Sequence, residues 1–251
     1  MEESGRLARG DGPDLAYLRT PGSAPTVVFL PGFRSDMQGA KAAEVAALCA
    51  AHGAGCLRLD YGGHGASAGR FEDGTISGWT ADALHGIDRL TEGPLVLVGS
   101  SMGGWIALLV ALARPDRVAG LVGIAAAPDF TERLMWDAML PAERATLLRD
   151  GVVFAPSEYG DPLPITRALI EDGRRRLLLD GPIPLNCPVR LLHGQRDADV
   201  PWKTSLRLAE RLASPDVQVT LLKDGDHRLS RPADLALLRR TVATLLGENG
   251  A

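Results

Sequence analysis

The sequence predicts an α/β protein with a mainly parallel sheet and helices on both faces. Short apolar runs rich in β-branched residues alternate along the chain with longer segments whose apolar residues recur at helical spacing. Parallel strands need crossover connections, so this alternation places helices over both faces of the sheet. The length of 251 residues, with 45% hydrophobic and 23% charged side chains, suits a single folded domain, residues 1–251.

The predicted strands are short runs bounded by turn residues, and the predicted helices lie between them. The parallel strands are expected at 26–30, 55–61, 94–100, 118–128, 188–194 and 217–226. The helices with the clearest spacing are expected at 40–51, 79–90, 103–113 and 206–212. Residues 6–20 differ, because two short runs flank a Gly-Asp-Gly-Pro turn signal at 10–13, which predicts an antiparallel hairpin at the sheet edge.

One long segment interrupts the alternation. Between 129 and 180 no strand of the earlier kind is evident, and three stretches, 129–140, 141–151 and 164–179, have helical spacing. A strand-like run resumes directly afterwards at 188–194. We therefore expect 129–180 to be a helical cap inserted into the domain and not a second domain.

The charge distribution argues against a nucleic-acid partner. The chain has 27 basic and 31 acidic side chains, a formal net charge of −4, and no stretch dense enough in Lys and Arg to follow a phosphate backbone. The densest basic cluster, Arg174 to Arg176, follows Glu171 and Asp172. That mixture is typical of a solvated helical face.

The cysteines and the N-terminus predict a cytoplasmic protein. Cys49, Cys56 and Cys187 are odd in number and form no C-x-x-C pair, which argues against a disulfide framework and a zinc site, so no metal is expected. The first residues lack the apolar core of a signal peptide. No apolar run reaches the roughly 18 residues of a membrane span.

Two adjacent serines, Ser100 and Ser101, lie in the turn between the run at 94–100 and the helix at 103–113. A serine on a sharp strand-to-helix corner takes strained dihedral angles, so the residues two before and two after it must be nearly without side chains. Only Ser101 has glycine, Gly99 and Gly103, at both places. Ser101 is therefore the candidate nucleophile, and its alternative role is the N-cap of the helix.

A serine hydroxyl needs a base, and the base needs an orienting carboxylate. His227 follows the last predicted strand and precedes the closing helix, which places it at the same sheet edge as Ser101. Asp197 follows the preceding strand and faces the same edge. The order Ser101, Asp197, His227 is the nucleophile, acid, base order of one hydrolase fold. By contrast, His52 and His85 lie in helical runs and are expected to be surface or packing residues.

These features resemble the α/β-hydrolase fold superfamily. The segments FLPGF, LDYGGHGAS, GSSMGG, HGQRDADVP and GDH match its landmarks in order and span most of the chain. The superfamily's geometry implies two backbone donors for the oxyanion, at Met102 after the nucleophile and at Phe33 after the first parallel strand. The resemblance also implies that His64 supports a structural loop and that His193 belongs to a strand end.

The sequence is more closely similar to the abhydrolase-domain family of acyl-protein thioesterases and acyl-glucuronide esterases. The similarity lies in NCPVRLLHGQRDADVPWKTSL, in DVQVTLLKDGDHR, and in PSEY and ITRALIEDG within the cap. In that family the acid is the aspartate four residues after the histidine of H-G-x-x-D. The resemblance therefore selects Asp197 over Asp199.

The expected function is hydrolysis of carboxylic esters or thioesters through an acyl-enzyme, without metal or organic cofactor. The partner is then a small ester or an acylated protein. Met135, Trp136 and Leu140 in the cap are candidate acyl-pocket residues, with plain helix packing as their alternative. Two other functions stay open, a non-catalytic small-ligand receptor on the same fold and an amidase or peptidase. A dehalogenase or epoxide hydrolase is disfavoured, because it needs a carboxylate where Ser101 stands.

The sequence leaves the acyl group, the leaving group and the oligomeric state open. It also leaves open whether Arg34, Arg167 and the cluster at 174–176 bind an anion or have structural roles.

Overall fold

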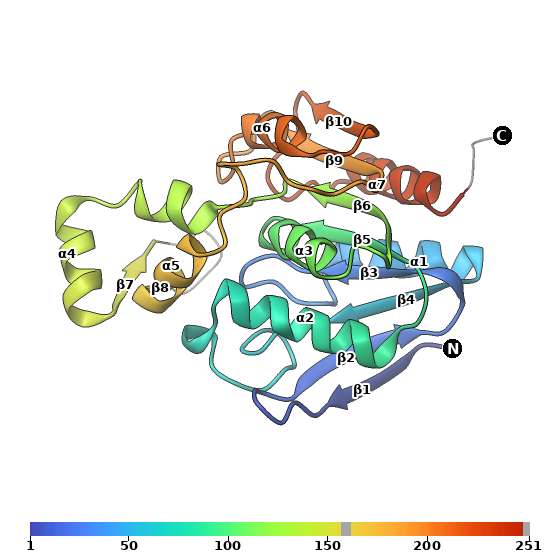
Figure 1. The fold of residues 1–251 in the computed structure, drawn as a ribbon, viewed down its shortest axis with the longest axis horizontal. Helices are drawn as coiled ribbons and strands as arrows, with labels where there is room; N and C mark the ends of the chain where they lie inside the picture. Colours follow the sequence, from blue (N-terminus) through green and yellow to red (C-terminus); the bar gives the residue numbers. More distant parts are fainter. Residues whose placement is uncertain (157–161, 248–251) are drawn as a thin grey trace.

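The centre of the computed structural model is an eight-stranded sheet with the strand order β1-β2-β4-β3-β5-β6-β9-β10. The structure describes residues 1–156 and 162–247. Within this sheet the neighbouring strands β4, β3, β5, β6, β9 and β10 run parallel, which confirms the predicted sheet (Figure 1). The bounds are β1 (Glu3–Leu7), β2 (Leu15–Thr20), β3 (Ser23–Leu30), β4 (Ala54–Leu59), β5 (Leu95–Ser100), β6 (Val118–Ile124), β9 (Val189–Gly194) and β10 (Val217–Leu222).

The N-terminal hairpin lies at one edge of the sheet, as predicted. β1 pairs antiparallel with β2, from Glu3 opposite Arg19 to Leu7 opposite Leu15, and β2 pairs antiparallel with β4. The first strand begins earlier than residue 6. Edge strands carry little apolar pattern on their exposed face, so the sequence pattern predicted too late a start for β1.

Helices cover both faces of the sheet. α1 (Ala40–His52) and α7 (Pro232–Leu245) pack on one face, and α2 (Ile76–Leu90), α3 (Met102–Ala113) and α6 (Lys203–Arg211) pack on the other (Figure 1). Along β5, Val96 and Val98 face the first layer, whereas Leu95 and Leu97 face the second. Burial on both faces explains why the central strands are continuous apolar runs.

The segment 129–180, called the cap below, extends beyond the carboxyl ends of the parallel strands (Figure 1). It contains a π-helical turn (Thr131–Trp136), α4 (Pro141–Asp150), β7 (Val152–Ala155), β8 (Leu163–Thr166) and α5 (Arg167–Arg174). The antiparallel pair β7–β8 is a feature that the sequence did not predict. Strands of four residues are too short to show a period of two, so the predicted helix from 164 is wrong over 164–166, where the structure has the end of β8. Most of the PSEY stretch at 156–159 lies outside the described residues.

A buried carboxylate ties the two ends of the cap together. Asp129 is fully buried, and its backbone is left-handed with a φ of 62°. Its Oδ1 accepts the N–H of Leu178 at 2.8 Å, and its Oδ2 accepts the N–H of Leu179 at 3.0 Å. Arg133 reaches Asp180 at 2.5 Å beside this contact. The cap therefore leaves and rejoins the sheet at one anchored point.

Candidate active site

Ser101 lies on a strained corner between β5 and α3. Its φ of 53° and ψ of −118° place a non-glycine residue in a region that L side chains rarely adopt. A Cβ at Gly99 would come within 2.3 Å of the Gly103 carbonyl oxygen, and a Cβ at Gly103 within 2.0 Å of the Leu30 carbonyl oxygen. The corner therefore requires both flanking glycines, as the sequence predicted.

The Ser101 hydroxyl contacts His227 and does not cap the helix. Ser101 occupies the N-cap position of α3, but its side chain makes no capping bond. Its Oγ lies 3.1 Å from Nε2 of His227. Ser100, by contrast, is the buried last residue of β5, in register with Ile124 of β6. The geometry thus favours the candidate nucleophile over its alternative role.

His227 also contacts Asp197, so side chains from three loops meet. Nδ1 of His227 lies 2.8 Å from Oδ2 of Asp197. An ionised carboxylate only accepts hydrogen bonds, so the proton is on Nδ1, and Nε2 is left to accept from the Ser101 hydroxyl. The loops after β5, β9 and β10 supply the three residues, because the carboxyl ends of parallel strands share one edge.

Asp197 is held by four donors. Its Oδ1 accepts the backbone N–H groups of Asp199 at 2.9 Å and Val200 at 2.8 Å, while its Oδ2 faces His227 and, at 3.1 Å, Nε2 of His193. The side chain is fully buried, and burial by itself raises its pKa. The hydrogen bonds from His193 and His227 outweigh burial and hold the pKa of Asp197 well below its ordinary value. Asp197 is thus ionised, and the exposed Asp199 contributes its backbone to the same turn.

The structure places His193 against the candidate acid, which the sequence did not anticipate. His193 is the penultimate residue of β9, and its side chain is 0% exposed. Besides Asp197, its ring contacts the Ser205 hydroxyl at 2.7 Å and the Val200 carbonyl at 3.0 Å. The spacing of four residues between His193 and Asp197 was the signal available in the sequence, because the turn after β9 folds one side chain back over the other.

The predicted oxyanion donors stand beside Ser101. Met102 opens α3, and the first N–H groups of a helix have no intrahelical acceptor. Phe33 lies in the loop after β3, where a Cβ on Gly32 would come within 3.2 Å of the Ser100 carbonyl oxygen and 3.4 Å of the Ser101 Cβ. This loop is therefore packed directly against the corner. The role of the two N–H groups stays a prediction.

A buried histidine supports the loop that contains Phe33. The N–H of Arg34 donates to Nε2 of His64 at 3.3 Å, and Nδ1 of His64 lies 3.4 Å from the Gly62 carbonyl. Burial lowers the pKa of His64 to about 4, so its ring is neutral and can accept at Nε2. The Tyr61 hydroxyl donates to the Pro31 carbonyl at 3.3 Å. His64 thus has the structural role that the resemblance implies.

Aromatic rings form a wall beside this loop. The ring centroid of Phe33 lies 4.9 Å from that of Phe71, 5.7 Å from that of Trp79 and 5.5 Å from that of Phe130. Phe130 also packs edge-on against Trp105 at 5.7 Å. The sequence analysis assigned no role to Phe71, which begins a short 3₁₀ helix, or to Phe130, which directly precedes the π-helical turn. Because Phe130 leads directly into the π-helical turn, this aromatic wall adjoins the start of the cap.

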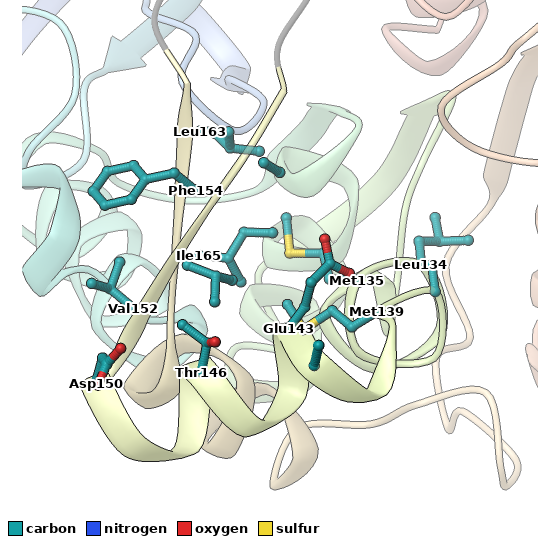
Figure 2. A pocket seen from close by; sticks show the side chains of 14 residues that line it. Leu134, Met135, Met139, Glu143, Thr146, Asp150, Val152, Phe154, Leu163 and Ile165 are labelled. Atoms are coloured by element: carbon teal, nitrogen blue, oxygen red, sulfur yellow. The ribbon is translucent and has the colours of Figure 1, made fainter.

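The cap contains a pocket of about 800 Å³ that is open to solvent. Figure 2 shows apolar side chains of β7 and β8, including Val152 and Ile165, and apolar side chains at the π-helical turn, including Met135, whereas α4 adds the polar side chains of Glu143 and Thr146. Of the candidate acyl-pocket residues, Met135 lines this cavity. Trp136 is stacked against Arg144 and Arg174, and Leu140 is 65% exposed, so these two have other surroundings.

The arginines left open by the sequence have protein partners. Arg34 donates through its backbone to His64, and its guanidinium lies 6.0 Å from the Phe71 ring centroid. The contacts in the cap are Arg167 with Glu171 at 2.7 Å, Arg174 with Glu132 at 2.6 Å, Arg175 with Asp172 at 3.1 Å and Arg176 with the Ser77 hydroxyl at 2.7 Å. These contacts favour structural roles over anion binding.

Asp197, Asp199 and His227 form a group whose ligand atoms lie within 4.8 Å of one another. Both Asp197 oxygens are already occupied by N–H donors, and Nδ1 of His227 is one of those donors. A metal ion would have to displace these bonds, so the group fits a hydrogen-bonded acid and base better than a cation site. In the described part of the chain, no helix has the length and apolar character needed to cross a membrane.

The comparisons with known proteins agree with the fold. Residues 23–153 match the family model described as serine aminopeptidase, S33. The chain is 42% identical over 243 residues to the palmitoyl-protein thioesterase ABHD10, mitochondrial, from Homo sapiens, covering 96% of this chain and 79% of the relative. The solved structure of alpha/beta hydrolase domain-containing protein 10 from mouse matches with a TM-score of 0.90 and 40% identity, covering 98% of each chain. A solved structure from Agrobacterium vitis S4 matches with a TM-score of 0.92 and 42% identity, covering 98% of each chain.

The fold and its relatives define the chain as an α/β hydrolase, an enzyme of the serine hydrolase class that acts on ester bonds. Within that class it belongs to the family that contains these palmitoyl-protein thioesterases. The relatives are named as mitochondrial, so the predicted cytoplasmic location has no support among them.

Proposed function

We propose that the protein is a thioesterase and esterase that uses Ser101 as nucleophile, His227 as general base and acid, and Asp197 as the orienting carboxylate. The observation that carries this proposal is the continuous contact from Ser101 Oγ to His227 at 3.1 Å and from His227 to Asp197 at 2.8 Å, starting at a strained corner. A neutral hydroxyl attacks an acyl carbon only when a base takes its proton, and this geometry provides that base.

In the first half-reaction Ser101 Oγ forms a bond to the acyl carbon as its proton passes to Nε2 of His227. The Asp197 carboxylate stabilises the resulting imidazolium, and the tetrahedral oxyanion is stabilised by the N–H groups of Met102 and Phe33. The carbon–sulfur or carbon–oxygen bond then breaks. The leaving group takes the proton from Nε2, which leaves the acyl group on Ser101.

In the second half-reaction water replaces the leaving group. His227 takes a proton from the water as its oxygen bonds to the acyl carbon, and the second tetrahedral intermediate collapses with cleavage of the bond to Ser101 Oγ. His227 returns the proton to Ser101. The products are a carboxylic acid and the regenerated hydroxyl, so atoms and protons balance without a cofactor.

We propose long-chain acyl thioesters, including S-acylated proteins, as the preferred substrates. The curated relatives are named palmitoyl-protein thioesterases, and the cap of this chain has a largely apolar pocket of about 800 Å³, whose lining includes no triad residue and none of Phe33, Phe71 and Phe130. Apolar surface of this kind suits a hydrocarbon chain, because each buried methylene contributes about 0.8 kcal/mol. Acyl glucuronides are the alternative ester class implied by the family resemblance.

The test is a turnover survey with matched serine variants. Nitrophenyl esters of increasing chain length, an S-acylated peptide and an acyl glucuronide are compared by kcat/KM at neutral pH. We expect turnover of the long-chain thioester, its loss by a factor of about 10⁶ in Ser101→Ala, and its retention in Ser100→Ala. Absence of turnover on every substrate would favour the receptor alternative, and equal losses in both variants would refute the role of Ser101.

A further inference from the structure

A second histidine contacts the carboxylate of the proposed triad. Nε2 of His193 lies 3.1 Å from Oδ2 of Asp197 and 3.0 Å from the Val200 carbonyl oxygen. Nδ1 of the same ring lies 2.7 Å from the hydroxyl of Ser205 on α6. His193 and Ser205 are both buried, with exposed fractions of 0% and 1%. His227 and His193 therefore share one carboxylate oxygen, and only His227 reaches Ser101.

The partners of His193 determine where its ring proton lies. Nε2 faces two acceptors, the Asp197 carboxylate and the Val200 carbonyl, so Nε2 carries the hydrogen. In the neutral ring Nδ1 is then an acceptor and takes the hydrogen of the Ser205 hydroxyl. Ser205 thus selects the tautomer of His193 that donates to Asp197. The donors run in one direction, from Ser205 through His193 to the acid.

The environment of Asp197 makes this donor significant. The carboxylate is buried, and an ionised carboxylate is stable in such a place only when its oxygens are satisfied. The titratable groups that face it are His193, His227 and the neighbouring Asp199, whose carboxylate adds no donor. Backbone N–H groups donate to Oδ1 of Asp197. His193 is therefore the side chain that shares Oδ2 with the catalytic base.

We propose, resting on the proposed function, that His193 is a positioning residue: its Nε2–H, oriented by Ser205, fixes Oδ2 of Asp197 and withdraws part of its negative charge from His227. The acid then holds the ring of His227 in the tautomer that accepts from Ser101. His193 does not touch the substrate or the reacting atoms.

This role predicts a change in pH dependence. Without the Nε2–H donor, the charge on Asp197 acts on His227 alone and stabilises its protonated form. Because His227 must be neutral to accept the Ser101 proton, the acidic limb of kcat/KM moves to higher pH. The loss of activity is then greatest at low pH and diminishes as the pH rises. A residue that only filled space would lower activity by the same factor at every pH.

The experiment compares four variants by steady-state hydrolysis of one ester between pH 5 and 9. In His193→Ala we expect kcat at pH 7 to fall by up to about tenfold with KM within about twofold, and the acidic limb to rise by about one pH unit. His193→Gln, which keeps an N–H donor, restores most of the limb position. Ser205→Ala, which leaves the ring but removes its orienting hydroxyl, shifts the limb in the same direction by less. The exposed His52→Ala is the matched control and changes nothing.

The outcomes separate this proposal from the proposed function. If Ser101→Ala is inactive while the limb stays fixed in His193→Ala and Ser205→Ala, the positioning role is wrong and the triad stands. If Ser101→Ala stays active, the proposed function itself fails. If His193→Ala does not fold, as judged by circular dichroism, the test uses the pH profiles of His193→Gln and Ser205→Ala. An unchanged acidic limb in Ser205→Ala then overturns the proposal.

Discussion

The sheet edge that holds the candidate site and the cap are each stabilised by a different kind of interaction. At the sheet edge each loop is fixed by buried polar groups with defined partners, such as His64 under the Phe33 loop and His193 beside Asp197. In the cap the centre is a small apolar cluster of Met139, Leu147, Ile165 and Ile170. Hydrogen bonds define direction, whereas apolar packing tolerates substitution.

The polar contacts at the surface of the cap are weaker than those at the sheet edge. Its ion pairs, including Arg167 with Glu171 and Arg174 with Glu132, are partly exposed and contribute little individually. Asp129 is the exception, since it is fully buried and accepts the backbone N–H groups of Leu178 and Leu179 at the other end of the cap. We infer that the sheet edge performs the chemistry and that the cap adjusts substrate selection.

The strongest test of the sheet edge is substitution of its acid. Asp197→Asn should lower kcat by a factor of about 10⁴, because an amide facing Nδ1 favours the wrong tautomer of His227. Asp199→Asn is the matched control and should lose less than about tenfold, since Asp199 joins this turn through its backbone N–H. Both are measured by steady-state hydrolysis of one ester. A greater loss of kcat in Asp199→Asn would show that Asp197 is not the acid.

The next test concerns the bond that the sheet edge cleaves, because the matching family model is described as a serine aminopeptidase. Thiolates and phenolates leave without prior protonation, whereas an amide nitrogen must first receive a well-placed proton. A nitrophenyl ester should therefore have a kcat/KM at least about 10³ times that of the matched nitroanilide, with or without chelator. Comparable rates would indicate an amidase, and inhibition by chelator would indicate a metal.

The cap should affect chain-length selection and not the chemical step. Ala142 lies on α4, is exposed and lines the cavity, so Ala142→Phe places a ring where a long chain would lie. We expect kcat/KM for a long-chain ester to fall about tenfold while that for a short-chain ester is unchanged. Ala145→Phe on the same helix, at a residue that does not line the cavity, is the matched control. Equal changes in kcat/KM for the long-chain and the short-chain ester would show that the cavity does not bind the acyl chain.

The smallest effect on chemistry is expected at the junction of the two regions. Asp129→Asn weakens the acceptor for Leu178 and Leu179 and should lower the free energy of unfolding by about 1–3 kcal/mol. Hydrolysis of a short-chain ester should change by less than about threefold, because the triad contacts do not involve Asp129. Thermal unfolding is compared with that of Asp137→Asn on the exposed side of the cap. An unchanged melting temperature would show that Asp129 does not anchor the cap.

The sequence predicted most of the sheet but less of the cap for a physical reason. The central strands bury both faces, so β5 and β9 appear as apolar runs whose bounds differ from the predicted ones by one residue. Helix α2 begins at Ile76, three residues before the predicted start, because the Thr75 side chain accepts the N–H of Gly78 at 3.0 Å. The strands β7 and β8 pair only with each other, and so brief a pair leaves no periodic signal.

The candidate site was predictable where local backbone determines it. Ser101 was recognisable because its flanking glycines are required by the corner itself. The choice of Asp197 over Asp199 needed the family resemblance, since both follow the same strand. The contact of His193 with Asp197 was not predicted, because it depends on a turn that brings the Asp197 N–H to 3.3 Å from the Gly194 carbonyl.

Direct detection of the acyl-enzyme tests the central claim that Ser101 is the nucleophile. The protein is mixed with a long-chain thioester, quenched in acid within the first turnover, and analysed by intact mass and peptide mapping. The account predicts a mass increase equal to one acyl group on the peptide that contains Ser101, and no such increase in Ser101→Ala. An acyl group on any other residue, or acylation that persists in Ser101→Ala, would contradict it.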